Sequence, residues 1–83
     1  MTWSVTDPPG GIRLDDTKIE IWYAHLDQLC ADQATSQRFP GVSMAFDVWL
    51  GWNVIYSSDR IQEAKDLALQ LRDALVSMGV SVS

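Results

Sequence analysis

The chain has 83 residues, of which 47% are hydrophobic and 20% charged, and its formal net charge is −5. A chain of this size buries roughly 60% of its unfolded surface, which supports one small core and therefore a single domain over residues 1–83. Eleven acidic residues face six basic ones, so clustered Lys and Arg that would neutralise phosphates are missing and nucleic-acid binding is not expected.

The cysteine and histidine content excludes the usual stabilising chemistries. Cys30 and His25 are the single residues of their types, so the chain can form neither an internal disulfide nor a Cys/His zinc site. A lone cysteine and an N-terminus without a basic, apolar leader favour a cytoplasmic location. The most apolar segment, residues 42–56, is shorter than the about 20 apolar residues that a membrane span needs. We expect no cofactor, no metal ion and no membrane contact.

The N-terminal half predicts a strand, a loop and a long helix. Residues 2–6 alternate polar and apolar side chains, and residues 7–11 read Asp-Pro-Pro-Gly-Gly, which breaks the pattern. A helix is then expected from Asp15 or Asp16 to about residue 36, with Asp15 as its N-cap. Its apolar face would carry Ile19, Trp22, Tyr23, Leu26, Leu29 and Cys30.

The C-terminal half predicts a hairpin, a second helix and a short strand. Residues 42–48 and 52–56 alternate with a period of two around Leu50-Gly51, which favours two antiparallel strands; one long strand kinked at Gly51 is the alternative. A helix capped by Ser57 or Ser58 should run to Gly79, the C′ residue. Residues 80–82 would close the chain as a strand. The expected apolar face of this helix carries Ile61, Ala64, Ala68, Leu71, Leu75 and Met78.

This order of elements, β-α-β-β-α-β, predicts an α+β fold with the ferredoxin-like topology. Right-handed crossovers would then give a four-stranded antiparallel sheet with two helices on one face. The topology rests on element order alone, and because it serves many unrelated functions it predicts none of them.

The sequence offers no catalytic constellation. His25 and Cys30 would lie about 140° apart around the expected helix, too far apart to form a dyad. Asp16, Glu20 and Asp27 would share one side of that helix, where a solvated flank is favoured over a cation site. We therefore expect no enzymatic activity, no catalytic residue and no metal ligand.

Four tryptophans are many for so short a chain. Trp22 belongs to the apolar face of the expected first helix, and Trp3 and Trp52 are expected to fill the core. Trp49 would lie near the hairpin tip, on the sheet face shared with Asp47 and away from the helices. A large aromatic side chain there either caps the core or binds a partner.

Two further apolar surfaces would remain outside the core. Leu69 and Val76 would form a strip on the outer side of the second helix, and Ile21 would lie on the outer side of the first. Together with Trp49 these are the candidate partner-binding residues. They favour a non-enzymatic protein–protein interaction domain that binds another protein or itself as a homodimer.

Such a domain would suit a small accessory or inhibitory protein of a phage or mobile element. The alternative is a regulatory domain that binds a small ligand as a dimer. A third reading, an aromatic sheet surface for single-stranded nucleic acid, is disfavoured by the acidic balance.

Overall fold

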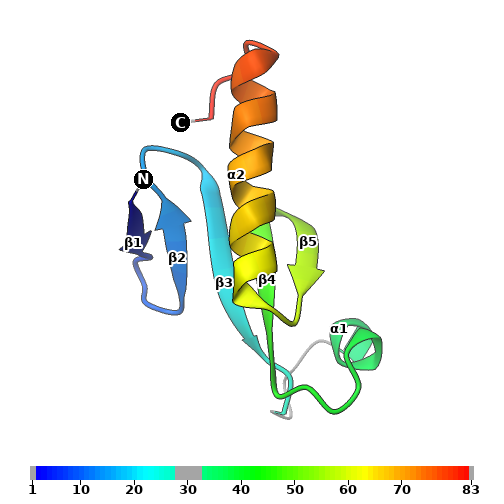
Figure 1. Cartoon of the computed structure of the whole chain (residues 1–83). Coiled ribbons are helices and arrows are strands. Elements are labelled where there is room, and N and C mark those ends of the chain that lie inside the picture. The colour runs from blue at the N-terminus through cyan, green and yellow to red at the C-terminus, as the bar shows by residue number, and fades with distance from the viewer. Residues whose placement is uncertain (1, 28–32, 83) are drawn as a thin grey trace.

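The computed structural model describes residues 2–27 and 33–82 as one antiparallel sheet with a long helix across it. The strands pair in chain order, and α2 lies along β3, β4 and β5 on one face (Figure 1). In order the elements are β1 (Trp3–Val5), β2 (Gly11–Leu14), β3 (Ile19–His25), α1 (Gln33–Arg38), β4 (Met44–Leu50), β5 (Asn53–Ser58) and α2 (Ile61–Ser77). The expected four-stranded ferredoxin-like sheet with two helices is therefore wrong, because the described residues form a five-stranded meander in which α2 is the one helix longer than two turns.

The main correction concerns the long helix expected from residue 15. The described residues of its first half form the turn 15–18 and the strand β3, and α1 covers Gln33–Arg38. Ile19 and Ile21 are fully buried on one face of β3, while Glu20 and Trp22 point to the other. β-Branched and aromatic residues fit a pleated, half-buried surface, so this alternation prevails over the helical spacing. Leu29 and Cys30, expected on the same helix, lie outside the described residues.

The two aspartates expected to start that helix form the β2–β3 turn instead. Asp16 adopts the left-handed region with φ of 52°. The Thr17 hydroxyl donates to the carbonyl oxygen of Leu14 at 2.7 Å and accepts from the backbone N–H of Ile19 at 3.1 Å. Asp is favoured both at helix N-caps and in turns, which is why the sequence alone does not separate the two.

The β4–β5 hairpin confirms the prediction of two strands and excludes the kinked single strand. Leu50 pairs with Asn53, so the turn consists of Gly51 and Trp52, with Gly51 at φ 61°. A two-residue turn needs positive φ, which glycine adopts at no steric cost. The register shifts after Val48, which leaves Ile55 as the extra residue of a β-bulge.

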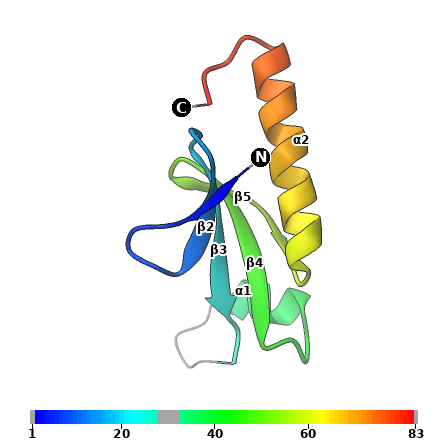
Figure 2. The same cartoon turned by 60° about the vertical axis from the view of Figure 1, so that its left-hand side comes forward.

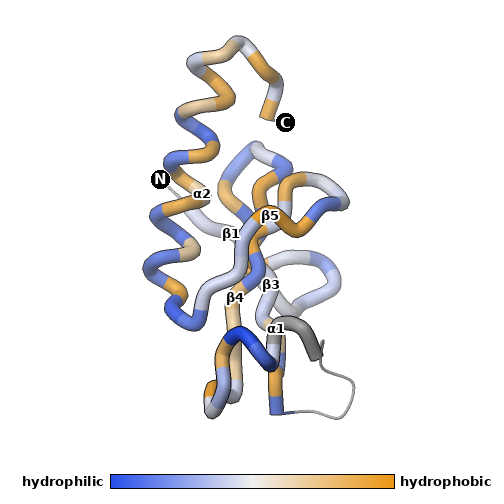
Figure 3. The backbone as a smooth tube through the Cα atoms, turned by 90° about the vertical axis from the view of Figure 1, so that its right-hand side faces the viewer, coloured by the Kyte–Doolittle hydropathy of each residue, from blue (hydrophilic) through white to orange (hydrophobic). Residues whose placement is uncertain are grey.

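The second helix is confirmed, and Figure 3 shows hydrophilic and hydrophobic bands alternating along it. Gly79 follows its last residues with φ of 76°, as a C′ glycine does. The expected serine cap is corrected, because Arg60 is the N-cap residue and Ser58 Oγ accepts the Arg60 N–H at 3.1 Å. Residues 80–82 form no strand; instead the Val82 carbonyl accepts the Lys18 N–H at 2.6 Å.

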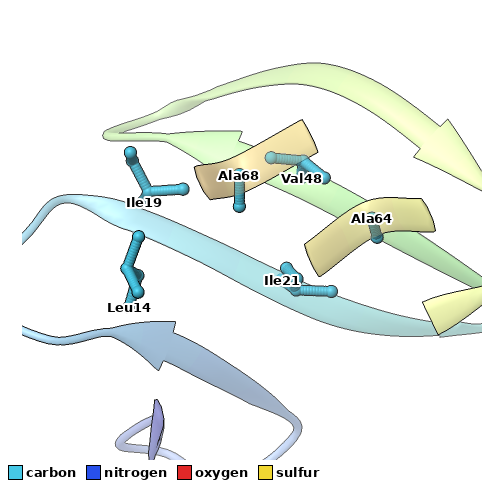
Figure 4. Close-up of a cluster of buried hydrophobic side chains, with 6 residues drawn as sticks. All are labelled: Leu14, Ile19, Ile21, Val48, Ala64 and Ala68. Atoms are coloured by element: carbon cyan, nitrogen blue, oxygen red, sulfur yellow. The ribbon is translucent and has the colours of Figure 1, made fainter. Parts of the chain in front are cut away.

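The core lies between α2 and the middle of the sheet. Ala64 and Ala68, one turn apart on α2, are both fully buried. Their small side chains let the helix backbone approach the strands closely, where they meet the larger residues of the sheet (Figure 4). The cluster consists of Leu14, Ile19, Ile21, Val48, Ala64 and Ala68.

We expect Ile21→Ala to lower the free energy of unfolding by about 2–5 kcal/mol, because it leaves a cavity in this cluster. Val76→Ala is the control: Val76 is 59% exposed, and its truncation should change stability by less than about 0.5 kcal/mol. Urea denaturation followed by circular dichroism measures both. An Ile21→Ala variant as stable as wild type would place Ile21 outside the core.

A second contact ties β5 to the first turn of α2. The Tyr56 hydroxyl donates to a carboxylate oxygen of Glu63. This hydrogen bond is the main cause that lowers the pKa of Glu63 below its ordinary value of 4.5, and a hydrogen bond from Ser58 is the second cause. The same bond, followed by burial, raises the pKa of Tyr56. Glu63 therefore contributes stability above its unfolded pKa, and that contribution is lost as the pH falls through its folded pKa.

Tyr56→Phe should accordingly flatten the loss of thermal stability on acidification below about pH 4.5, because it removes the main cause of the lowered Glu63 pKa. Melting temperatures between neutral and acidic pH measure this for wild type and variant. Glu63→Gln, which removes the titrating group, should flatten the same region. An unchanged acid slope in Tyr56→Phe would show that the bond does not set the Glu63 pKa.

Candidate functional site

The sheet face opposite α2 carries the candidate site. In the view of Figure 2, α2 lies on one side of the sheet, where it contacts β3, β4 and β5. Strand alternation places Glu20 and Trp22 of β3 and Asp47 and Trp49 of β4 on the other side. Glu20 pairs with Trp49 and Trp22 with Asp47, so the two indoles are diagonal neighbours across the strands.

Two open clefts lie on this face and share the residues Glu20, Gly51 and Trp52. The first, which we call the aromatic cleft, has a volume of about 310 Å³ and is also lined by Trp22 and Trp49. The second, the polar cleft, has a volume of about 300 Å³, and its further residues are Arg13, Thr17 and Lys18. Trp52 therefore borders both clefts.

Trp22 is held in place from two sides. Its Nε1 donates to Glu20 Oε1 at 3.3 Å. Its six-membered ring lies beside Gly10, where an added Cβ would approach Cζ3 to 3.2 Å. A Cβ on the buried Gly11 would collide with the backbone carbonyl oxygen of Ile21. The Gly10-Gly11 pair thus gives β3 and the Trp22 indole room to approach β2.

Trp52 is placed by the contact between two turns. The Gly51 N–H donates to the Lys18 carbonyl oxygen at 3.1 Å, which joins the β4–β5 turn to the β2–β3 turn. At the second position of its turn, Trp52 is 94% exposed. The expectation that Trp52 fills the core is therefore wrong, and Trp52 instead borders both clefts.

Trp49 completes the aromatic cleft from β4 and is half-buried. Its Nε1 is buried and makes no hydrogen bond within residues 2–27 and 33–82, an uncommon state for an indole N–H. Asp47 shares its face, as the alternation predicted, and accepts a 2.6 Å hydrogen bond from the Ser57 hydroxyl. The hydroxyl of Ser57, on the neighbouring strand β5, therefore stabilises the carboxylate of Asp47.

The predicted partner-binding residues do not form one surface. Trp49 lines the aromatic cleft, while Val76 is exposed on α2. Leu69 is half-buried and packs against the core cluster, since its flank of α2 turns toward the sheet. The expected exposure of Ile21 is wrong, because Ile21 belongs to a buried strand and is 0% exposed.

Glu20, Trp22 and Trp52 are the site residues that sequence reasoning missed. The signal for the first two was present as the period-two pattern of residues 19–24, in which Ile19, Ile21 and Tyr23 alternate with Glu20, Trp22 and Ala24. The same segment also matches a helical stripe, and a helix there would separate these residues from Trp49.

The other candidate chemistries are not assembled. His25 is exposed at the end of β3, and Cys30 lies outside the described residues. Asp16 and Asp27 lie beyond opposite ends of β3, so they do not join Glu20 in one cluster. Within the described part of the chain no group of His, Cys, Asp or Glu has metal-site geometry, and no helix is long and apolar enough to cross a membrane.

The chain matches no protein-family model, no curated protein and no solved structure.

Trp52→Ala should leave the free energy of unfolding within about 0.5 kcal/mol of wild type, because the side chain makes few contacts in the fold. It should also remove the tryptophan fluorescence that acrylamide quenches most readily, since Trp52 is 94% exposed. Trp3→Ala is the contrasting variant. Trp3 packs against the core, so its loss should cost more than about 1 kcal/mol. Loss of stability in Trp52→Ala comparable to that of Trp3→Ala would mean that Trp52 is packed.

Proposed function

We propose that the chain is a non-enzymatic protein–protein interaction domain that binds its partner through the open face of the sheet. The observation that carries this proposal is the 94% exposed Trp52 standing beside two further tryptophans in one cleft. Tryptophan is enriched among the residues that dominate binding energies, where it fills or forms a desolvated pocket. Because the Trp52 indole packs so little against the rest of the chain, it contributes far less to the stability of the fold than it could to binding.

The outer surface of α2 is the weaker docking surface. Leu69 is engaged by the core, so the expected strip is reduced to Val76 with the exposed Met78 and Val80 at the end of the helix. Isolated exposed aliphatic residues are common and need no partner. The open sheet face, in contrast, combines a cleft, three indoles and charged groups of both signs.

A regulatory domain that binds a small ligand remains the second candidate, because the same cleft supports it. A volume of about 310 Å³ lies at the lower end of the range of ligand pockets, and such pockets combine aromatic walls with few polar groups. Because the cleft is open, a second copy of the chain would have to cover it to enclose a ligand.

Binding of a protein partner is tested by affinity capture from a lysate of the organism that encodes the chain, with wild type, Trp52→Ala and Val76→Ser as baits. We expect one or more proteins to be retained by wild type and Val76→Ser and lost with Trp52→Ala, by at least about tenfold if Trp52 contributes as an interface hot spot. Quantitative mass spectrometry gives the ratios, and sedimentation of the purified chain shows whether the partner is a second copy. Partners lost with Val76→Ser and kept by Trp52→Ala would move the interface to α2.

A further inference from the structure

We infer that the aromatic cleft receives a cationic side chain, the ammonium of a lysine or the guanidinium of an arginine, from a protein partner. The inference rests on the proposed function and names the chemistry of the group that this face recognises. It follows from the aromatic walls, the charge of Glu20 and the distribution of charge around Trp52.

The walls of the aromatic cleft suit a cation. Trp22, Trp49 and Trp52 line it together, and within the described part of the chain no two of these indoles stack on each other. Their electron-rich faces are therefore not used up by ring contacts. A cation within about 6 Å of an indole centroid is attracted by the ring quadrupole, and tryptophan is the strongest of the aromatic residues in this interaction.

Glu20 supplies the charge that would select a cation. It is the charged residue that lines the aromatic cleft. Its Oε1 accepts the hydrogen bond from Trp22, and its second carboxylate oxygen makes no hydrogen bond with residues 2–27 or 33–82. Arg13 is its cross-strand neighbour, yet the two side chains form no ion pair in this part of the chain. The carboxylate is thus oriented by an indole and remains open to a partner.

The basic residues of this face border the polar cleft, which shares Glu20, Gly51 and Trp52 with the aromatic cleft. Arg13 and Lys18 line the polar cleft and not the aromatic one. A partner that places a basic side chain in the aromatic cleft can therefore place an acidic or carbonyl group near Arg13 and Lys18. The net charge of −5 favours encounter with a basic partner at longer range.

The test uses the whole chain and two capped pentapeptides, Gly-Gly-Lys-Gly-Gly and the same peptide with norleucine in place of lysine. The two differ in the ammonium group. In a nitrogen–proton correlation spectrum of the labelled protein, each of the four tryptophans gives its own indole signal. We expect the lysine peptide to shift the signals of Trp22, Trp49 and Trp52 and to bind about fivefold more tightly than the norleucine peptide. Trp3 packs on the α2 side of the sheet, so its signal is the internal control.

Two single-residue variants test the sign of the charge. Glu20→Gln keeps an oxygen that accepts the Trp22 N–H but removes the charge, so it should weaken the lysine peptide about threefold or more and leave the norleucine peptide unchanged. Arg13→Gln removes a positive charge from the neighbouring cleft and should not weaken the lysine peptide. The spectrum of each variant also shows whether it is folded.

Equal affinities for the lysine and norleucine peptides would overturn the inference, and so would a folded Glu20→Gln variant that binds lysine as wild type does. Either result, with shifts still confined to the three cleft indoles, would leave the open face as the docking surface. Partner capture that does not depend on Trp52 would instead overturn the proposed function, whatever the peptides show.

Discussion

The contact of α2 with the middle of the sheet, made through Ala64 and Ala68, is the constraint on which the rest of the structure depends. Both alanines are fully buried, and they allow the helix to approach Ile21 and Val48 on the two central strands. Since α2 covers one face alone, the side chains on the other face must themselves shield the sheet from solvent. Trp22 and Trp49 lie on this other face. The cleft that they line remains open because α2 packs on the opposite face of the sheet.

The elements that the sequence predicted well carry signals that agree with one another. α2 has an apolar stripe and a terminal glycine, and the hairpin has two alternating runs with a glycine between them. Residues 15–25 carry a conflicting signal, because Ile19, Trp22 and Tyr23 match a helical stripe and also alternate in a strand. Asp15 and Asp16 fit a helix start and a turn equally well. Hydrogen bonding to β2 and β4 makes this segment a strand in the folded protein. The sequence of the segment alone does not show which strands it pairs with.

The candidate site was predictable only in part for the same reason. Trp49 and Asp47 were expected on the open face, since their strand was recognised and period-two alternation fixes the side of each residue. Trp52, Val54 and Tyr56 are two residues apart, so an unbroken strand would place all three side chains on one face. The bulge at Ile55 breaks that alternation: Val54 pairs with Trp49 and Tyr56 with Val48, so the two face opposite sides. A bulge moves the side chains of all later residues of its strand to the opposite face. The residue types in 53–56 do not predict a bulge at this position.

The pairing of every strand with its neighbour in sequence has a consequence for how the chain folds. In a meander each strand pairs with the strand next to it in the sequence, so no pairing joins strands that are far apart along the chain. Topologies rich in such local contacts fold faster than those with long-range pairings. The longest connection between paired strands is the segment 26–43 between β3 and β4. These are also the strands that carry Ile21 and Val48, so closing that segment brings the two halves of the core together. The entropy lost in that closure grows only slowly with segment length, so residues added there would slow folding little.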